Sequence, residues 1–95
     1  MVKTERFTWD DDKNETLLAE RGLTFEEIVV ALETSLIDHG SNPGHPGQDL
    51  FIVEIDGYAW AVPADPLEVG WFLRTAYPSR KFTKRFLWEK ARRRE

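Results

Sequence analysis

Apolar residues recur at helical spacing in the first third of the chain. Residues 25–36 carry them at every third or fourth position, which places them on one face of a helix. Thr24 and Glu27, at the start of this stripe, have the spacing of a capping box. A shorter stripe around Leu17 follows three aspartates and stops at Gly22, a residue typical of helix C-termini. The pattern predicts helices over 11–21 and 24–36.

Strand patterns dominate the rest of the chain. Two β-rich runs within 50–62 are separated by Asp56-Gly57, the pair that favours a two-residue hairpin turn. Alternation over 71–77 predicts a further strand, and Phe7-Thr8-Trp9 predicts a short edge strand. Residues 38–49 are rich in Gly and Pro, which predicts a loop.

The C-terminal segment predicts one more helix. Ser79 can cap a helix from about 80 to 93, with Phe82 and Phe86 facing inward. The predicted order is β-α-α-β-β-β-α in one domain over residues 1–95. This order indicates an α+β fold, in which an antiparallel sheet of three to four strands carries helices packed on one face.

Composition narrows the class of protein. The chain has 95 residues, of which 41% are hydrophobic, enough for one packed core. No apolar run approaches the roughly 20 residues of a membrane span, and no N-terminal run resembles a signal peptide. With no cysteine, the chain has neither disulfides nor a thiolate zinc site. We therefore expect a cytoplasmic protein without a membrane partner.

Charge is strongly polarised along the chain. Residues 1–73 hold 4 basic and 15 acidic side chains, a balance of −11, whereas residues 74–95 hold 9 basic and 2 acidic ones, a balance of +7. The C-terminal end therefore predicts a surface that binds anions, and nucleic acid is compatible with it. A merely solvated basic helix is the alternative.

Four basic residues lie at the start of the last predicted helix: Arg80, Lys81, Lys84 and Arg85. Ordinary helices favour acidic side chains in the first turn, so basic ones there suggest function. Trp88 shares a face with two of these cations and either stacks on a base or packs against the sheet. If the anion is a nucleic acid, Lys84, Trp88 and Arg92 are the residues expected to contact it.

Conventional catalytic motifs are absent, and two histidines remain to be considered. His39 and His45 lie six residues apart in the predicted loop, a placement without the fixed spacing of metal ligands. We expect no metal site. The two histidines are either exposed loop residues or candidates for proton transfer.

Two segments carry distinctive motifs. The first, FTWDDDKNETLLAERGLTFEEIVVAL, has a Trp-Asp, a Lys-Asn helix and an LTFEE helix, and the second is FLRTAYPSRKFTKR. Together they resemble the BrnT family of bacterial toxins, small ribonucleases similar in fold to RelE. The resemblance implies the toxin of a type II toxin–antitoxin pair. It implies an endoribonuclease that works without metal or cofactor, inhibits translation and growth, and is neutralised by a small DNA-binding antitoxin encoded nearby.

Under this resemblance, catalysis falls on basic side chains. Arginine stays protonated, so Arg74, Arg80 and Arg85 suit stabilisation of the charge that develops on phosphorus. Lys81, Tyr77 and a loop histidine are open candidates for proton transfer. Two alternatives remain: a non-catalytic RNA- or protein-binding module of the same fold, and an interaction protein that acts through its acidic surface.

Overall fold

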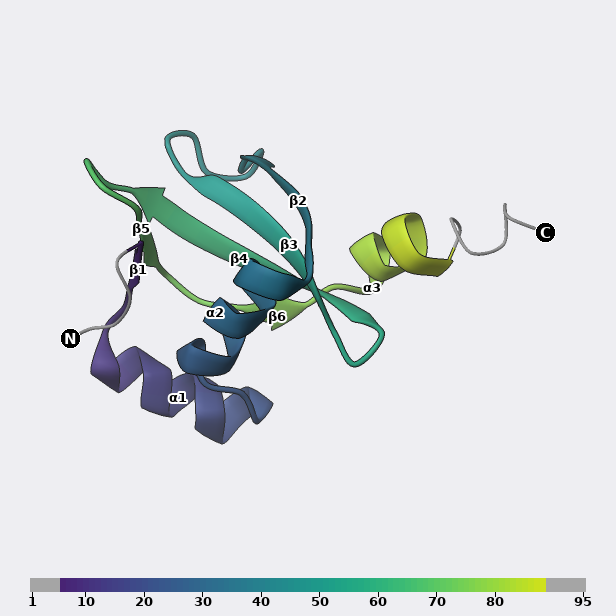
Figure 1. Ribbon diagram of the computed structural model, residues 1–95, viewed down its shortest axis with the longest axis horizontal. Helices are drawn as coiled ribbons and strands as arrows, with labels where there is room; N and C mark the ends of the chain where they lie inside the picture. The colour runs from purple at the N-terminus through teal and green to yellow at the C-terminus, as the bar shows by residue number, and fades with distance from the viewer. Residues whose placement is uncertain (1–5, 89–95) are drawn as a thin grey trace.

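The computed structural model describes residues 6–88, and these form a mixed α+β domain (Figure 1). The chain is mixed as predicted, but its sheet has six strands instead of three or four. The elements are β1 (Phe7–Thr8), α1 (Asp11–Arg21), α2 (Phe25–Thr34), β2 (Leu36–Ser41), β3 (Asp49–Ile55), β4 (Tyr58–Pro66), β5 (Trp71–Leu73), β6 (Tyr77–Pro78), α3 (Arg80–Phe82) and the π-helical segment η1 (Thr83–Trp88).

The first two helices begin where local signals predict, and α1 also ends where predicted. The Asp10 side chain accepts a hydrogen bond from the Asp12 backbone N–H, and Gly22 ends α1 in the left-handed conformation. The capping box of α2 is confirmed: Thr24 Oγ1 accepts from the Glu27 N–H, and the Glu27 carboxylate accepts from the Thr24 N–H at 2.9 Å. Helix α2 ends at Thr34, two residues earlier than predicted.

The capping box gives a direct stability prediction. Thr24→Ala removes the side-chain acceptor and should lower the free energy of unfolding by roughly 0.5–2 kcal/mol. Ser41→Ala, at an exposed position of β2, is the control and should have almost no effect. Urea denaturation of both variants checks this, and equal losses would contradict the contribution of the cap.

The hairpin predicted at Asp56-Gly57 is confirmed. Strands β3 and β4 pair antiparallel with Ile55 opposite Tyr58, which leaves two residues in the turn. Asp56 has φ 54° and Gly57 has φ 79°, and two positive φ angles are what a type I′ turn requires.

The predicted loop over 38–49 is partly wrong. Its first residues belong to β2, which pairs antiparallel with β3 and forms one edge of the sheet. The register between the two strands shifts after Leu36, because β2 advances by two residues to Asp38 while β3 advances by one. Ladder hydrogen bonds to a buried neighbour outweigh the low strand propensity of Asp38, His39 and Gly40.

The strand predicted over 71–77 is two short strands. Both β5 and β6 pair antiparallel with β4, and they are separated by residues 74–76. Strand β1 is an edge strand as predicted, but it pairs parallel with β5, so the sheet is not purely antiparallel.

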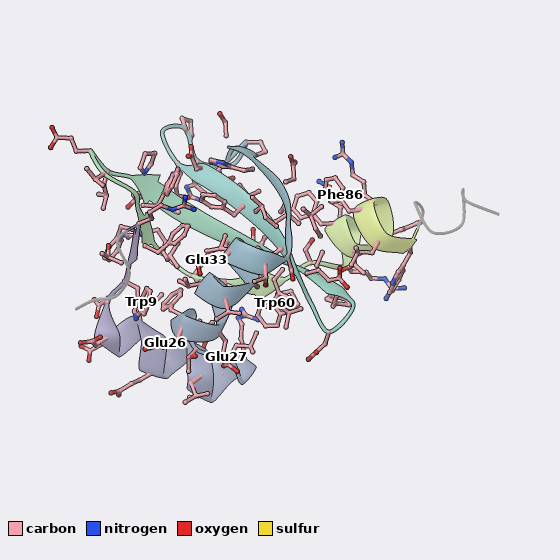
Figure 2. The ribbon with its side chains drawn as sticks, in the orientation of Figure 1. Trp9, Glu26, Glu27, Glu33, Trp60 and Phe86 are labelled. Carbon is pink, nitrogen blue, oxygen red and sulfur yellow. The ribbon has the colours of Figure 1, made fainter. Side chains whose placement is uncertain are left out.

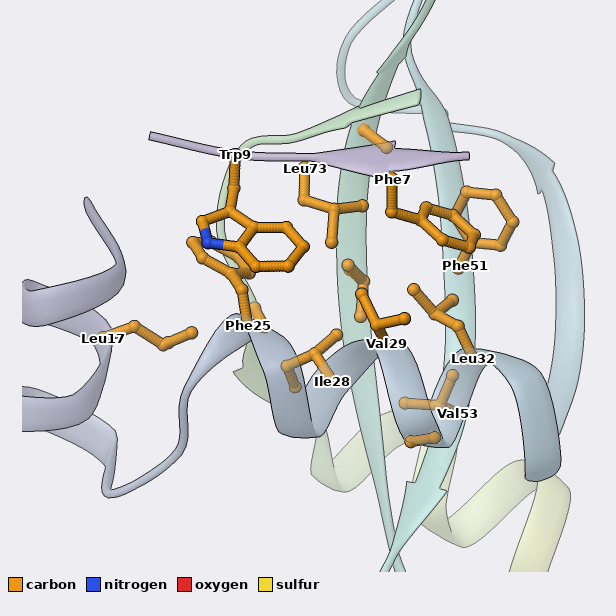
Figure 3. Packing of buried hydrophobic residues seen from close by; sticks show 14 residues of the cluster. Phe7, Trp9, Leu17, Phe25, Ile28, Val29, Leu32, Phe51, Val53 and Leu73 are labelled. Carbon is orange, nitrogen blue, oxygen red and sulfur yellow. The ribbon is translucent and has the colours of Figure 1, made fainter. Parts of the chain in front are cut away.

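Helices cover both faces of the sheet, so the prediction of helices on one face is wrong. Helices α1 and α2 pack on one face over the main core (Figure 3). The opposite face carries a second hydrophobic cluster. Side chains of α3 and η1, which together we call the C-terminal helix, pack on it. Because β3 alternates, Phe51 and Val53 face the first cluster while Leu50 and Ile52 face the second.

One buried hydroxyl attaches the C-terminal helix to the sheet. Thr83 is fully buried, and its Oγ1 accepts a hydrogen bond from the Ala59 N–H at 2.8 Å while donating to the Ser79 carbonyl at 2.7 Å. The predicted cap at Ser79 and the inward positions of Phe82 and Phe86 are confirmed. Predicted helical residues beyond 88 lie outside the described part of the chain.

Candidate nucleic-acid interface

Four cations of the C-terminal helix lie together as the sequence predicts. They are exposed side chains that line one open hollow, and we call them the basic surface: Arg80, Lys81, Lys84 and Arg85. Phe82, Phe86 and Leu87 from the same helix pack on the sheet, which directs the intervening positions outward (Figure 2 labels Phe86). The alternation of apolar and basic residues thus positions the charge.

Within residues 6–88, no carboxylate neutralises the cations of the basic surface. Among residues 6–88, no ion pair involves any of the four. Three of them lie instead over aromatic rings: Arg80 is 5.5 Å from the Trp88 ring centre, Lys81 5.5 Å from that of Phe82, and Arg85 5.2 Å from that of Phe86. Such contacts orient the cations and leave their charge available to an anion.

Of the two roles expected for Trp88, simple packing against the sheet is not what the structure shows. Trp88 is 42% exposed and belongs to neither hydrophobic cluster, so it does not simply pack against the sheet. Its ring meets Tyr58 edge to face, with ring centres 6.3 Å apart and planes at 75°. An exposed indole among cations offers a surface on which a base can stack.

Arg74 lies apart from the basic surface. The Arg74 backbone N–H donates a hydrogen bond to the Pro63 carbonyl of β4. The backbone N–H of Ser79, the residue before Arg80, donates to the Ala59 carbonyl, four residues earlier in the same strand. Four residues of a strand span about 13 Å, so the backbones of Arg74 and Arg80 are separated by roughly that length. The Arg74 guanidinium is 3.5 Å from the Asp65 carboxylate, and the two side chains are 54% and 41% exposed. The structure therefore does not bring the two arginines together.

Tyr77 lies closer to the basic surface in the fold. It pairs in register with Ala61, whose side chain belongs to the cluster under the C-terminal helix. Paired residues of neighbouring strands point to the same face, so Tyr77 shares a face of the sheet with the basic surface. Its ring is 37% exposed.

The two histidines have different environments. His39 is in β2, where its ring stacks on Phe51 with centres 4.0 Å apart and its Nε2 lies 3.0 Å from Asp49 Oδ2. Trp71 Nε1 donates to the same carboxylate oxygen at 2.9 Å. His45 lies in the turn between β2 and β3, and its exposed side chain makes no hydrogen bond among the described residues. The histidines thus do not form one site.

The cluster of His39, Asp49, Phe51 and Trp71 faces away from the basic surface. Phe51 and Trp71 belong to or pack against the core under α1 and α2, whereas the C-terminal helix packs on the other face. From the sequence, His39 was predicted only to lie in a loop. The strand register that joins His39 to Asp49 was not readable from the loop-like composition.

The cluster predicts a pH dependence of stability. Hydrogen bonds from His39, then from Trp71, hold the pKa of Asp49 below its usual 3.8. Because the folded pKa is lower than the unfolded one, the contribution to stability is complete above pH 3.8 and is lost as pH falls through the folded pKa. Asp49→Asn should therefore flatten the fall in unfolding free energy between pH 5 and pH 2, measured by urea denaturation. Asp38→Asn in β2, the neighbouring strand that carries His39, is the control, and an equal flattening would contradict this assignment.

Three further findings concern metal binding, membrane spanning and Arg92. Residues 6–88 contain no group of three or more His, Cys, Asp or Glu side chains that could hold a metal ion. No helix within this range has the length and apolar character needed to cross a membrane. Arg92, expected to contact RNA, lies outside the described residues.

Comparison with known proteins returns no relative. No protein family, no curated protein and no solved structure matches the chain. The BrnT resemblance therefore rests on the sequence motifs alone, and the RelE-like fold is not confirmed.

Proposed function

We propose that the protein binds single-stranded RNA through the basic surface. The observation that carries this proposal is the group of four exposed cations without carboxylate partners among residues 6–88, beside a half-exposed tryptophan. Cations supply sequence-independent affinity for phosphates, and aromatic rings stack on unpaired bases. RNA is preferred over other polyanions because the sequence motifs resemble those of a ribonuclease toxin family.

The proposal is tested by charge removal. The double variant Lys81→Ala/Lys84→Ala should bind a short single-stranded RNA more weakly, because two phosphate contacts are lost. The slope of log affinity against log salt should become shallower by about 1.4, since each single-strand contact contributes about 0.7. Fluorescence anisotropy at several salt concentrations measures both quantities.

A matched control separates the basic surface from general charge effects. Lys13→Ala removes a cation from the exposed side of α1 and should leave affinity and salt slope unchanged. If the double variant binds RNA as tightly as the parent, or Lys13→Ala weakens binding equally, the basic surface is not the interface.

RNA cleavage is the second candidate function, as the toxin of a toxin–antitoxin pair. It is favoured by Arg80, whose guanidinium is positioned over Trp88 without a described carboxylate partner and could stabilise charge on a scissile phosphate. The separation of Arg74 from Arg80 favours binding without cleavage. An antitoxin with an acidic segment would cover the basic surface and block RNA, and such contacts weaken with salt.

A further inference from the structure

We propose that a second hollow, on the α1–α2 side of the sheet and next to the β3–β4 turn, holds one unpaired base of the bound strand. This inference rests on the proposed RNA binding and adds a specific subsite to it. The aromatic hollow, as we call it, has a volume of about 390 Å³. Pockets for small ligands have volumes of about 300–1,000 Å³, so one base fits. Its lining residues are Arg21, Gly22, Leu23, Ile55, Asp56, Tyr58, Trp60 and Pro78.

The walls of the aromatic hollow are apolar and held by the core. Trp60 and Pro78 are register partners on β4 and β6, so they lie side by side across the sheet. Leu23, Ile55 and Trp60 are partly buried and pack against the main core (Figure 2 labels Trp60, beside α2). A preformed wall of flat and apolar side chains suits the face of a base, because every base has a π-face.

Two charged groups at the aromatic hollow match the polar parts of a nucleotide. Arg21, at the end of α1, has no ion pair among the described residues and can bind a phosphate. Asp56 lies in the tight turn between β3 and β4, where its carboxylate can accept a hydrogen bond from an exocyclic amine. Bases with such an amine, namely adenine, cytosine and guanine, should therefore bind better than uracil.

Tyr58 connects the aromatic hollow to the basic surface. It lines the aromatic hollow, and its ring contacts Trp88, which lies under Arg80. A strand whose phosphates lie along the basic surface would therefore pass Tyr58 at the end of the sheet and place a base on the opposite face. The flat apolar walls favour a nucleic-acid strand over an acidic peptide as the occupant, because unpaired bases stack on such walls.

The test combines base removal with side-chain removal. Short RNAs of one sequence, each with a single abasic position, are titrated against the parent protein. One of these RNAs should bind about 5- to 150-fold more weakly than the intact RNA, as expected for one lost stacking contact. Tyr58→Ala should bind the intact RNA more weakly by a similar factor. The same variant should lose nothing further on the RNA abasic at that position. Val69→Ala, an exposed apolar truncation between β4 and β5, is the control.

The outcomes separate this proposal from the one on which it rests. If the parent binds RNA but no abasic position matters, or Tyr58→Ala weakens all RNAs equally, the base site is overturned and the basic surface stands. If the parent binds no RNA, both proposals fail.

Exposed Arg21 gives a second variant should Tyr58→Ala not fold. Arg21→Gln should lower the affinity for intact RNA and leave thermal unfolding unchanged, and unchanged affinity would overturn the role of Arg21. Binding of an acidic aromatic peptide that RNA does not displace would also overturn the base site.

Discussion

Gly70→Ala should lower the free energy of unfolding by roughly 3–5 kcal/mol, among the largest effects expected of a single methyl group. A Cβ at this position would lie 2.7 Å from the carbonyl carbon of Arg6 and 2.9 Å from its Cα, and closer still to its oxygen. That oxygen accepts a hydrogen bond from the Trp71 N–H at 2.7 Å, a bond beside the parallel pairing of β1 with β5. Relief of the clash would therefore break the attachment of β1, which carries buried Phe7.

Gly22→Ala is the matched control for Gly70→Ala. Gly22 has φ 78° and Gly70 has φ 88°, so both substitutions incur the cost of a side chain in the left-handed region, about 1–2 kcal/mol. Only Gly70 has a neighbour in the way, since nothing lies within 4 Å of a Cβ at Gly22. Thermal and urea unfolding should therefore rank parent, Gly22→Ala and Gly70→Ala in that order. Similar losses for both variants would show that conformation, not steric contact, dominates.

Elements with self-contained signals were predictable from the sequence. The capping box of α2, the glycine that ends α1 and the Asp56-Gly57 turn each involve residues within four positions of one another. Local hydrogen bonds and backbone preference alone specify them. The same locality explains why the basic surface was predicted: its cations lie on consecutive turns of one helix.

Elements specified by distant partners were not predictable. Strand β2 has little burial and a loop-like composition, and pairing with β3 is what makes it a strand. The break between β5 and β6 similarly depends on how β4 pairs with each. Placement of the C-terminal helix on the opposite face follows from alternate residues of β3, which is buried on both sides.

In the candidate site too, features that depend on distant partners were not predictable from the sequence. The hydrogen bonds from His39 and Trp71 to Asp49 join residues 10 and 22 positions apart, so register had to be known first. The separation of Arg74 from Arg80 likewise depends on which residues of β4 they lie beside. The aromatic hollow combines the α1–α2 connection, the β3–β4 hairpin and β6, and no sequence motif indicates it.

Cleavage, the second candidate function, makes the other large prediction. If Arg80 stabilises charge that grows only in the transition state, Arg80→Ala should slow RNA cleavage about 10²- to 10³-fold, by analogy with a lost oxyanion donor. RNA affinity should fall much less, because only interactions that strengthen in the transition state raise the rate. Single-turnover cleavage and anisotropy titrations of the same RNA measure the two effects separately.

Two further variants specify what Arg80 does. Arg80→Lys keeps the charge but loses the planar pair of donors, so it should recover only part of the rate. Arg74→Ala should slow cleavage less than Arg80→Ala, because the Arg74 guanidinium pairs with Asp65 away from the basic surface. Circular dichroism must first show that each variant is folded. Folded Arg80→Ala that cleaves at the parental rate would refute the role of Arg80, and a parent that binds RNA without cleaving it would leave the binding module as the function.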